Sequence, residues 1–324
     1  MKKINIAILG LGNIGTGTYK LLEMNRKHIE QATDIDFQVK WILEKYTELD
    51  RGIVVDPKRW TQDPDEIMSD PCVDVVVELL GGIEFSTKLM IDAMNAGKHV
   101  VTANKAAVAA NFEILTETAE KNGVLFRYEA SVGGGIPLIN AITTSLVANE
   151  WVEFFGILNG TTNFILTKMT EEKLPYDVVL SEAQERGFAE ADPTADVEGI
   201  DVANKLSILM SIVFGKRVRP EEIPTTGITK ITSRDIDDAA KDNCVIKLLA
   251  SAKKVGDEIT CSVEPVLLNK KHPLSEVNDE FNALFLKGNA VDDVMLYGKG
   301  AGPLPTASAI WGDVIEIGRS VTNE

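Results

Sequence analysis

Lys205 lies in a segment rich in carboxylates. Asp201 precedes it by four residues, and the apolar pattern at residues 199–214 predicts a helix that would place both on one face. A lysine between a carboxylate and apolar walls can hold or release its proton in response to small changes. The loop before this helix adds further carboxylates, at Glu190, Asp192 and Asp196. The pattern is typical of proton transfer, and its carboxylates suit a substrate with an ammonium group. The alternative is an ordinary solvated loop.

Lys105 is the second lysine in a position that favours chemistry. It follows a predicted strand at residues 99–102, at the carboxyl end where open α/β sheets place their ligands. Either lysine could instead be a surface side chain with a solvated end. The three histidines, His28, His99 and His272, are scattered, so the sequence leaves the choice of proton donor between Lys105 and Lys205.

A glycine-rich turn lies near the start of the chain, between a predicted strand at residues 5–9 and a predicted helix at residues 16–29. It reads Gly10-Leu11-Gly12-Asn13-Ile14-Gly15. In such a turn the first glycine allows the tight bend, the second lets a pyrophosphate approach, and the third lets the helix pack on the strand. The helix N-terminus then binds the phosphates. This context predicts a dinucleotide site rather than a merely tight turn.

Glu44 stands at the end of the second predicted strand, residues 37–43. An acidic side chain there accepts hydrogen bonds from the adenosine ribose, which favours NAD over NADP. A carboxylate about 4 Å from a phosphate charge is repelled by roughly 4 kcal/mol at an effective dielectric constant near 20. Two alternatives remain: Glu44 points to solvent, or a phosphate is neutralised by one of the nearby cations Lys45, Arg51, Lys58 and Arg59.

The elements that must position these residues divide the chain in two. Strands alternate with helices over residues 1–135, which predicts a Rossmann-type, doubly wound parallel sheet. Residues 136–302 predict a second, mixed α+β domain for substrate binding and oligomerisation. We expect helices at residues 137–149 and 243–255 in this domain. A C-terminal helix at residues 303–324 is expected to pack back on the first domain.

Composition excludes several classes of protein. The 324 residues carry 33 Lys and Arg against 49 Asp and Glu, a net charge of -16 that argues against nucleic-acid binding. No apolar run is long enough to span a membrane. Three scattered cysteines support neither a disulfide framework nor a zinc site. These features are typical of a cytoplasmic protein.

Eight blocks of sequence, in order along the chain, resemble the homoserine dehydrogenase family. They are Gly10-Leu-Gly-Asn-Ile-Gly15, Val77-Glu-Leu-Leu-Gly-Gly82, Val101-Thr-Ala-Asn-Lys-Ala106, Glu129-Ala-Ser-Val-Gly-Gly-Gly-Ile-Pro137, Ile157-Leu-Asn-Gly-Thr-Thr-Asn163, Gly187-Phe-Ala-Glu-Ala-Asp-Pro193, Asp201-Val-Ala-Asn-Lys205 and Gly300-Ala-Gly-Pro-Leu-Pro-Thr-Ala-Ser308. The resemblance implies nicotinamide-dependent interconversion of L-homoserine and L-aspartate 4-semialdehyde, toward threonine and methionine. It also implies a homodimer formed through the sheet of the second domain.

The resemblance assigns roles to individual residues. Lys205 would donate the proton, and Lys105 would lie where nicotinamide and substrate meet. The residues implied to bind substrate are Glu190, which meets the α-ammonium, with Asp196, Asp201 and Gly187. Those implied for the cofactor are Gly10, Gly12, Asn13, Ile14, Gly15, Glu44, Gly81, Thr102, Lys105 and Gly302. A monovalent cation, usually sodium in similar proteins, would be held by Glu129 and the carbonyls of Val132, Gly134 and Ile136.

Two departures from the family pattern stand out. Many bacterial members carry a C-terminal ACT regulatory domain, and this sequence ends soon after Ser308, so we expect a short form that is insensitive to threonine. Glu44 replaces the basic residue that members preferring NADP tend to show. Two other interpretations stay open: a different amino-acid-pathway oxidoreductase with the same first domain, and a non-catalytic dinucleotide sensor.

Overall fold

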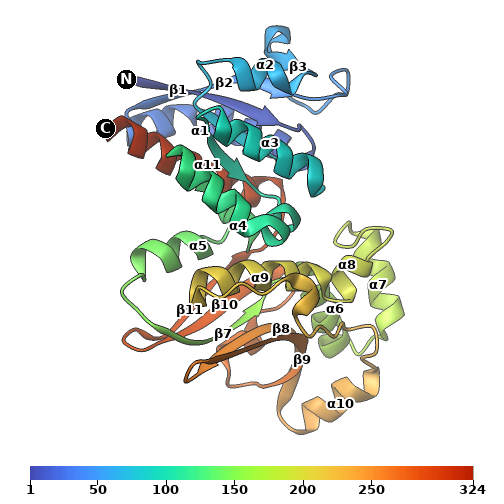
Figure 1. The fold of residues 1–324 in the computed structure, drawn as a ribbon. Helices are drawn as coiled ribbons and strands as arrows, with labels where there is room; N and C mark the ends of the chain where they lie inside the picture. Colours follow the sequence, from blue (N-terminus) through green and yellow to red (C-terminus); the bar gives the residue numbers. More distant parts are fainter. Residues whose placement is uncertain (324) are drawn as a thin grey trace. The chain divides into compact units, whose positions relative to one another are not determined.

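The structure, a computed structural model, describes residues 1–323 and divides the chain into two compact units. The first comprises Met1–Gly135 together with the C-terminal segment that starts at Gly302, and the second comprises Ile136–Ala301. Both ends of the chain therefore contribute to the first unit, as the colours in Figure 1 show. Glu324, the last residue of the expected C-terminal helix, lies outside the described residues.

The first unit contains a six-stranded parallel sheet in the order β3-β2-β1-β4-β5-β6. Its strands are β1 (Lys2–Leu9), β2 (Ile35–Leu43), β3 (Trp60–Thr61), β4 (Val75–Glu78), β5 (His99–Thr102) and β6 (Phe126–Arg127). The central strand β4 is buried along its whole length, as expected for a parallel strand covered on both faces. The strand order reverses next to β1, which is where sheets of this Rossmann type bind their ligands.

Helices cover both faces of this sheet: α1 (Asn13–Thr33), α2 (Pro64–Ser69), α3 (Glu84–Asn95), α4 (Lys105–Asn122) and α11 (Pro303–Asn323). The C-terminal helix α11 packs beside α1 (Figure 1). Trp311 donates a hydrogen bond to the Thr18 carbonyl at 2.8 Å and meets the ring of Phe37 edge-on. A Cβ on Gly17 would lie 2.6 Å from the Pro303 carbonyl oxygen, so this glycine lets the two helices approach.

The second unit contains a five-stranded antiparallel sheet in the order β11-β10-β7-β8-β9. Its strands are β7 (Trp151–Ile157), β8 (Cys244–Val255), β9 (Glu258–Asn269), β10 (Phe281–Gly288) and β11 (Asp292–Lys299). Its helices are α5 (Leu138–Asn140), α6 (Gly160–Glu171), α7 (Tyr176–Glu185), α8 (Thr194–Val197), α9 (Ile200–Phe214) and α10 (Ser233–Lys241). Phe154 on β7 stacks on Phe214 of α9, which places α9 over one face of the sheet.

One expected helix of this unit was wrong, and a second is shorter than expected. In place of the helix expected at residues 243–255, Cys244–Val255 form strand β8, which pairs with β7 and β9. Residues 246–250 of this strand are buried without interruption and mostly apolar, and such a short run does not distinguish strand from helix. The helix expected at residues 137–149 is reduced to α5 and a π-helical turn at Ala141–Ser145.

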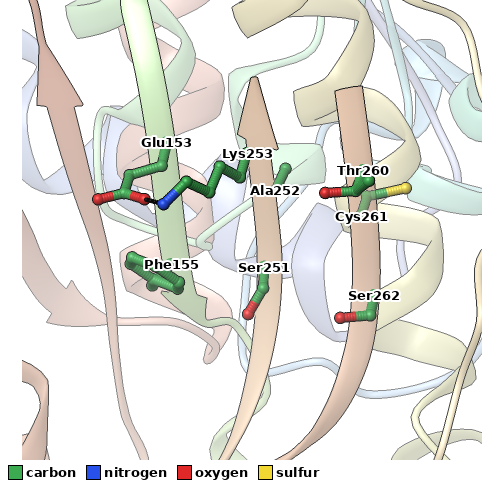
Figure 2. A pocket seen from close by; sticks show the side chains of 8 residues that line it. All are labelled: Glu153, Phe155, Ser251, Ala252, Lys253, Thr260, Cys261 and Ser262. Atoms are coloured by element: carbon green, nitrogen blue, oxygen red, sulfur yellow. Dashed lines mark ion pairs between the residues drawn. The ribbon is translucent and has the colours of Figure 1, made fainter. Parts of the chain in front are cut away.

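The other face of the five-stranded sheet carries an open hollow of about 300 Å³. Figure 2 shows Glu153 and Phe155 on β7 beside Lys253 on β8, whose ammonium lies 2.9 Å from the Glu153 carboxylate. Ser251 and Ser262 line the same hollow.

No helix in residues 1–323 is both long enough and apolar enough to cross a lipid bilayer.

Candidate active site

The glycine-rich turn has the geometry that its sequence predicts. Gly10 has φ +92°, and a Cβ there would lie 2.9 Å from the Leu79 carbonyl oxygen. A Cβ on Gly15 would lie 2.1 Å from the Gly10 carbonyl oxygen, so only glycine fits. The space around Gly12 is open. Helix α1 begins at Asn13, and no acidic side chain lies in its first turn. Its N-terminal amides are therefore suited to an anion.

A pocket of about 300 Å³ lies next to this turn, at the carboxyl ends of the central strands. Its lining residues are Ile14, Leu79, Gly81, Ala103, Asn104, Lys105 and Ala106. Asn104 caps α4 by accepting from the Ala107 amide and donates to the Gly82 carbonyl at 2.7 Å. The cap fixes the start of α4 and, with it, Lys105 in the pocket wall.

Thr102 is buried beneath this pocket rather than in its wall. Its hydroxyl donates to the Glu78 carboxylate at 2.7 Å and accepts from the Asn104 amide at 2.9 Å. Thr102 therefore supports the loop that carries Lys105. Gly302, which is also expected at the cofactor, has φ +110° just before α11, a conformation that favours glycine.

Glu44 lies against the glycine-rich turn and is largely shielded from solvent. Its carboxylate accepts from the Leu11 amide at 2.9 Å and the Tyr46 amide at 3.0 Å. Arg51 lies 3.4 Å from the same carboxylate and donates to the Leu11 carbonyl. Burial raises the pKa of Glu44, but the amide hydrogen bonds and the charge of Arg51 outweigh it, so the pKa is lowered overall. Glu44 is therefore an ionised side chain held next to the turn.

Lys205 is buried in the second unit, on the first half of α9. Its ammonium donates to the Leu158 carbonyl at 2.6 Å and to the Asp201 carboxylate at 2.7 Å. The side chains of Lys205 and Asp201 are 10% and 6% exposed, respectively. A buried ammonium requires such partners, because an isolated charge is too costly to remove from water. The structure thus brings together the two residues that the helical spacing paired.

Asp196 joins this cluster from the short helix α8. Its carboxylate accepts from the Asn159 amide at 2.7 Å and from the Thr161 hydroxyl at 3.3 Å. Burial, with Asp201 nearby, raises the pKa of Asp196, while hydrogen bonds from Asn159 and Thr161 and the charge of Lys205 act against the shift.

Glu190 and Gly187 lie on the exposed part of the loop after α7. Gly187 has φ +75° where that helix ends. Glu190 is exposed, and its backbone carbonyl is held by the Gln184 side chain at 3.1 Å. Asp192 is exposed too, and its carboxylate accepts from the amide and hydroxyl of Thr194, which fixes the loop. The loop therefore has a defined path, but the buried cluster contains Asp196, Asp201 and Lys205 without Glu190.

Sequence reasoning missed Asn159 as a member of the cluster. Its amide nitrogen contacts both carboxylates, at 2.7 Å to Asp196 and 2.9 Å to Asp201. The available signal was its position, directly after the predicted strand at residues 151–158 and before Thr161 and Thr162. An Asn in that place is a helix N-cap, and it caps α6 here.

The residues expected to hold a cation are buried oxygen donors. Glu129 is 5% exposed, and its amide donates to the Asp313 carboxylate at 2.9 Å. Burial raises the pKa of Asp313 well above its usual value, and the charge of Glu129 adds to this. Gly133 and Gly134 both have positive φ, which turns the backbone beside Val132. One carboxylate with backbone carbonyls is a donor set that fits a hard cation. In residues 1–323 no group of three or more His, Cys, Asp or Glu could hold a metal.

Comparison with known proteins identifies the family. The family model "Homoserine dehydrogenase, NAD binding domain" matches residues 10–129, and the model "Homoserine dehydrogenase" matches residues 137–315. The homoserine dehydrogenase of Bacillus subtilis is 41% identical over 98% of this chain and 73% of its own length. The chain belongs to the homoserine dehydrogenase family.

Homoserine dehydrogenases are oxidoreductases of amino-acid biosynthesis that interconvert L-homoserine and L-aspartate 4-semialdehyde. The Synechocystis homoserine dehydrogenase is 41% identical over 99% of this chain and 74% of its own length. The crystal structure of the Thiobacillus denitrificans homoserine dehydrogenase matches with a TM-score of 0.95 at 39% identity, covering 100% of this chain and 75% of that one. A hyperthermophilic archaeal homoserine dehydrogenase in complex with NADPH matches with a TM-score of 0.83 at 26% identity, over 98% of both chains.

Proposed function

We propose that this homoserine dehydrogenase moves the proton of its reaction through Lys205. The observation that carries the proposal is the buried ammonium held by the Leu158 carbonyl and Asp201. Reduction of the aldehyde needs an acid to protonate the developing alkoxide, and oxidation of homoserine needs a base for the hydroxyl proton. A nicotinamide cofactor, when bound, would supply or accept the hydride. Lys205 donates its proton in one direction and takes it back in the other.

The carboxylates of the second unit then orient the substrate. Glu190, exposed on its loop, would bind the α-ammonium of homoserine, because its carboxylate is accessible to a cation that enters from solvent. Asp196 and Asp201 form the buried side of the site, and the turn at Gly187 sets the path of the loop. This division leaves Asp201 to hold Lys205 and Glu190 to recognise the amino acid.

In the first unit, the glycine-rich turn and the adjoining pocket would hold the cofactor. Gly12, Asn13 and Ile14 would place the pyrophosphate at the start of α1, and Gly81 and Lys105 would hold the nicotinamide end. Glu44 favours NAD over NADP because its ionised carboxylate would face a 2′-phosphate. Arg51 acts against this preference for NAD, because its guanidinium lies beside the Glu44 carboxylate and would attract a 2′-phosphate.

A monovalent cation, sodium by family resemblance, would be held by Glu129 and the carbonyls of Val132, Gly134 and Ile136. The support is the buried Glu129 carboxylate next to Asp313, because two buried carboxyl groups together favour a bound cation or proton. The cation would act electrostatically: it would neutralise the Glu129 carboxylate and fix the backbone turn at Gly133 and Gly134.

We also propose a cytoplasmic homodimer, formed through the open face of the second unit's sheet. Met295 and Tyr297 on the edge strand β11 are 39% and 52% exposed. In the register they lie opposite Phe285 and Ala283, which belong to the apolar cluster on that face. Exposed apolar side chains on an edge strand are typical of a surface that another chain covers.

The test is the appearance of reduced nicotinamide, followed by absorbance, with L-homoserine and either NAD or NADP. We expect turnover that depends on both homoserine and cofactor, with NAD giving the higher kcat/KM. Absence of turnover with both cofactors, by a folded protein that binds them, would contradict the proposed activity.

A further inference from the structure

Asn159 lies between the two buried carboxylates of the Lys205 cluster. It is 5% exposed and follows Leu158, whose carbonyl accepts from Lys205. The same short segment between β7 and α6 therefore supplies an acceptor for the lysine and, one residue later, a donor for its carboxylate partner. The amide nitrogen of Asn159 donates to Asp196 at 2.7 Å and to Asp201 at 2.9 Å.

The orientation of the Asn159 amide is fixed by its other end. The side-chain oxygen accepts from the backbone amide of Thr162 at 2.8 Å, the N-cap bond of α6. A backbone N–H needs an acceptor and ionised carboxylates need donors, so the oxygen faces Thr162 and the nitrogen faces the carboxylates. Both amide hydrogens are used, one on each carboxylate.

This arrangement has an electrostatic consequence for the lysine. One oxygen of Asp201, Oδ2, accepts from both Asn159 and Lys205, so its charge is shared between the two donors. Asp196 also acts electrostatically on Lys205. Without the Asn159 amide, the two buried carboxylates would have fewer hydrogen-bond donors. Their negative charge would then act more strongly on the Lys205 ammonium.

We propose that Asn159 is a positioning residue for proton transfer: it holds Asp201 against Lys205 and keeps the Asp196 and Asp201 carboxylates in place. The inference rests on the proposed role of Lys205 and adds to it the group that sets the electrostatic surroundings of that lysine. Asn159 acts through its two carboxylate partners.

The experiment compares two substitutions that preserve the helix cap. Asn159→Ser keeps an oxygen for the Thr162 amide and removes both amide N–H donors. Asn159→Asp keeps the shape and the cap, removes the donors and adds a negative charge beside Lys205. We measure kcat and KM for homoserine oxidation across pH, together with the thermal midpoint and cofactor affinity by fluorescence.

Both variants should lose roughly tenfold to a hundredfold in kcat/KM, the usual effect of losing a hydrogen bond to a charged group. The pH at which kcat is half-maximal should move upward in both variants, because the carboxylates lose a donor and act more strongly on Lys205, and further in Asn159→Asp, which adds a carboxylate. Cofactor affinity should be unchanged. Of the two variants, Asn159→Ser adds no charge to the buried cluster and is the one less exposed to a loss of folding.

Thr232→Ala is the matched control, since Thr232 caps α10 through the Asp235 amide and only helix stability should change. If the Asn159 variants lose only stability, as this control does, and keep the wild-type pH midpoint and kcat/KM, Asn159 is a cap and the inference is wrong. A wild-type protein that binds cofactor but does not oxidise homoserine would instead overturn the proposed function, before the variants are compared.

Discussion

At the scale of single residues, Glu190 and Asp201 have opposite surroundings: one is exposed on a loop and the other is 6% exposed beside Lys205. Glu190→Gln should therefore leave the fold and the lysine cluster intact. We expect the KM for homoserine to rise roughly tenfold or more, because the charge-assisted bond to the substrate ammonium is lost. Steady-state kinetics checks this, with Glu185→Gln, on an exposed position of α7, as the control. Unchanged KM and kcat would remove Glu190 from the site.

The predicted preference for NAD over NADP rests on Glu44. The wild-type protein should show a higher kcat/KM with NAD than with NADP, since a phosphate near this carboxylate is repelled. Glu44→Gln keeps the side chain's shape and releases Arg51 from its ion pair, so the ratio should shift toward NADP. In the double variant Glu44→Gln with Arg51→Met, that shift should be smaller. A wild-type preference for NADP of tenfold or more would contradict the prediction.

The sequence could pair Asp201 with Lys205 because their spacing is local. It could not find Asn159, because its partners Asp196 and Asp201 lie 37 and 42 residues further along the chain. Only the fold shows that an N-cap residue also reaches two carboxylates. For Glu44 the sequence left solvent exposure open, and the answer depended on Leu11, 33 residues away.

At the scale of elements, Lys247 joins β8 to α6 and to the loop before β10. It is 2% exposed, and its ammonium donates to the Asn163 side chain, the Val277 carbonyl and the Asn278 side chain. Asn163 in turn donates to the carbonyls of residues 277, 279 and 281. Burial lowers the pKa of Lys247 to about 8, although Glu171, Asp279 and Glu276 act in the opposite direction.

This lowered pKa predicts a pH-dependent stability. The unfolded chain, with Lys247 near 10.5, binds more protons than the folded one between about pH 8 and 10.5, so this residue makes stability rise with pH across that window. One pKa unit corresponds to about 1.4 kcal/mol, so the gain is on the order of 3 kcal/mol relative to Lys247→Met. Denaturant unfolding of both proteins at pH 7 and 10 measures it. An equal pH dependence in the two proteins would contradict the prediction.

Elements of the first unit were easier to predict than those of the second. In a parallel sheet, apolar strands alternate with amphipathic helices, and glycines such as Gly97 and Gly123 mark the helix ends. The second unit is antiparallel and mixed, and its strand β8 pairs with β7, almost a hundred residues earlier along the chain. The local pattern of residues 243–255 therefore contained no information about that pairing, and the helix expected there was wrong.

At the scale of the whole molecule, we expect a dimer formed through the open sheet face of the second unit. A single charged substitution on that face should weaken it. Tyr297→Asp places a carboxylate on the apolar edge strand β11, and the dimer should dissociate at concentrations where the wild type stays paired. Light scattering after size exclusion measures the mass. Val178→Asp, on the exposed side of α7, is the control and should leave the mass unchanged. A monomeric wild type, or a variant that stays dimeric, would contradict this interface.

The most direct test of the central claim is the turnover of Lys205→Met, measured beside its affinity for cofactor. Methionine fills the buried site without an ionisable group. Loss of the proton donor and acceptor should lower kcat about 10²- to 10⁴-fold, while the Kd for cofactor, whose proposed pocket lies in the first unit, stays at the wild-type value. A variant that keeps near wild-type kcat with normal cofactor binding would show that Lys205 does not move the proton and would transfer that role to Lys105.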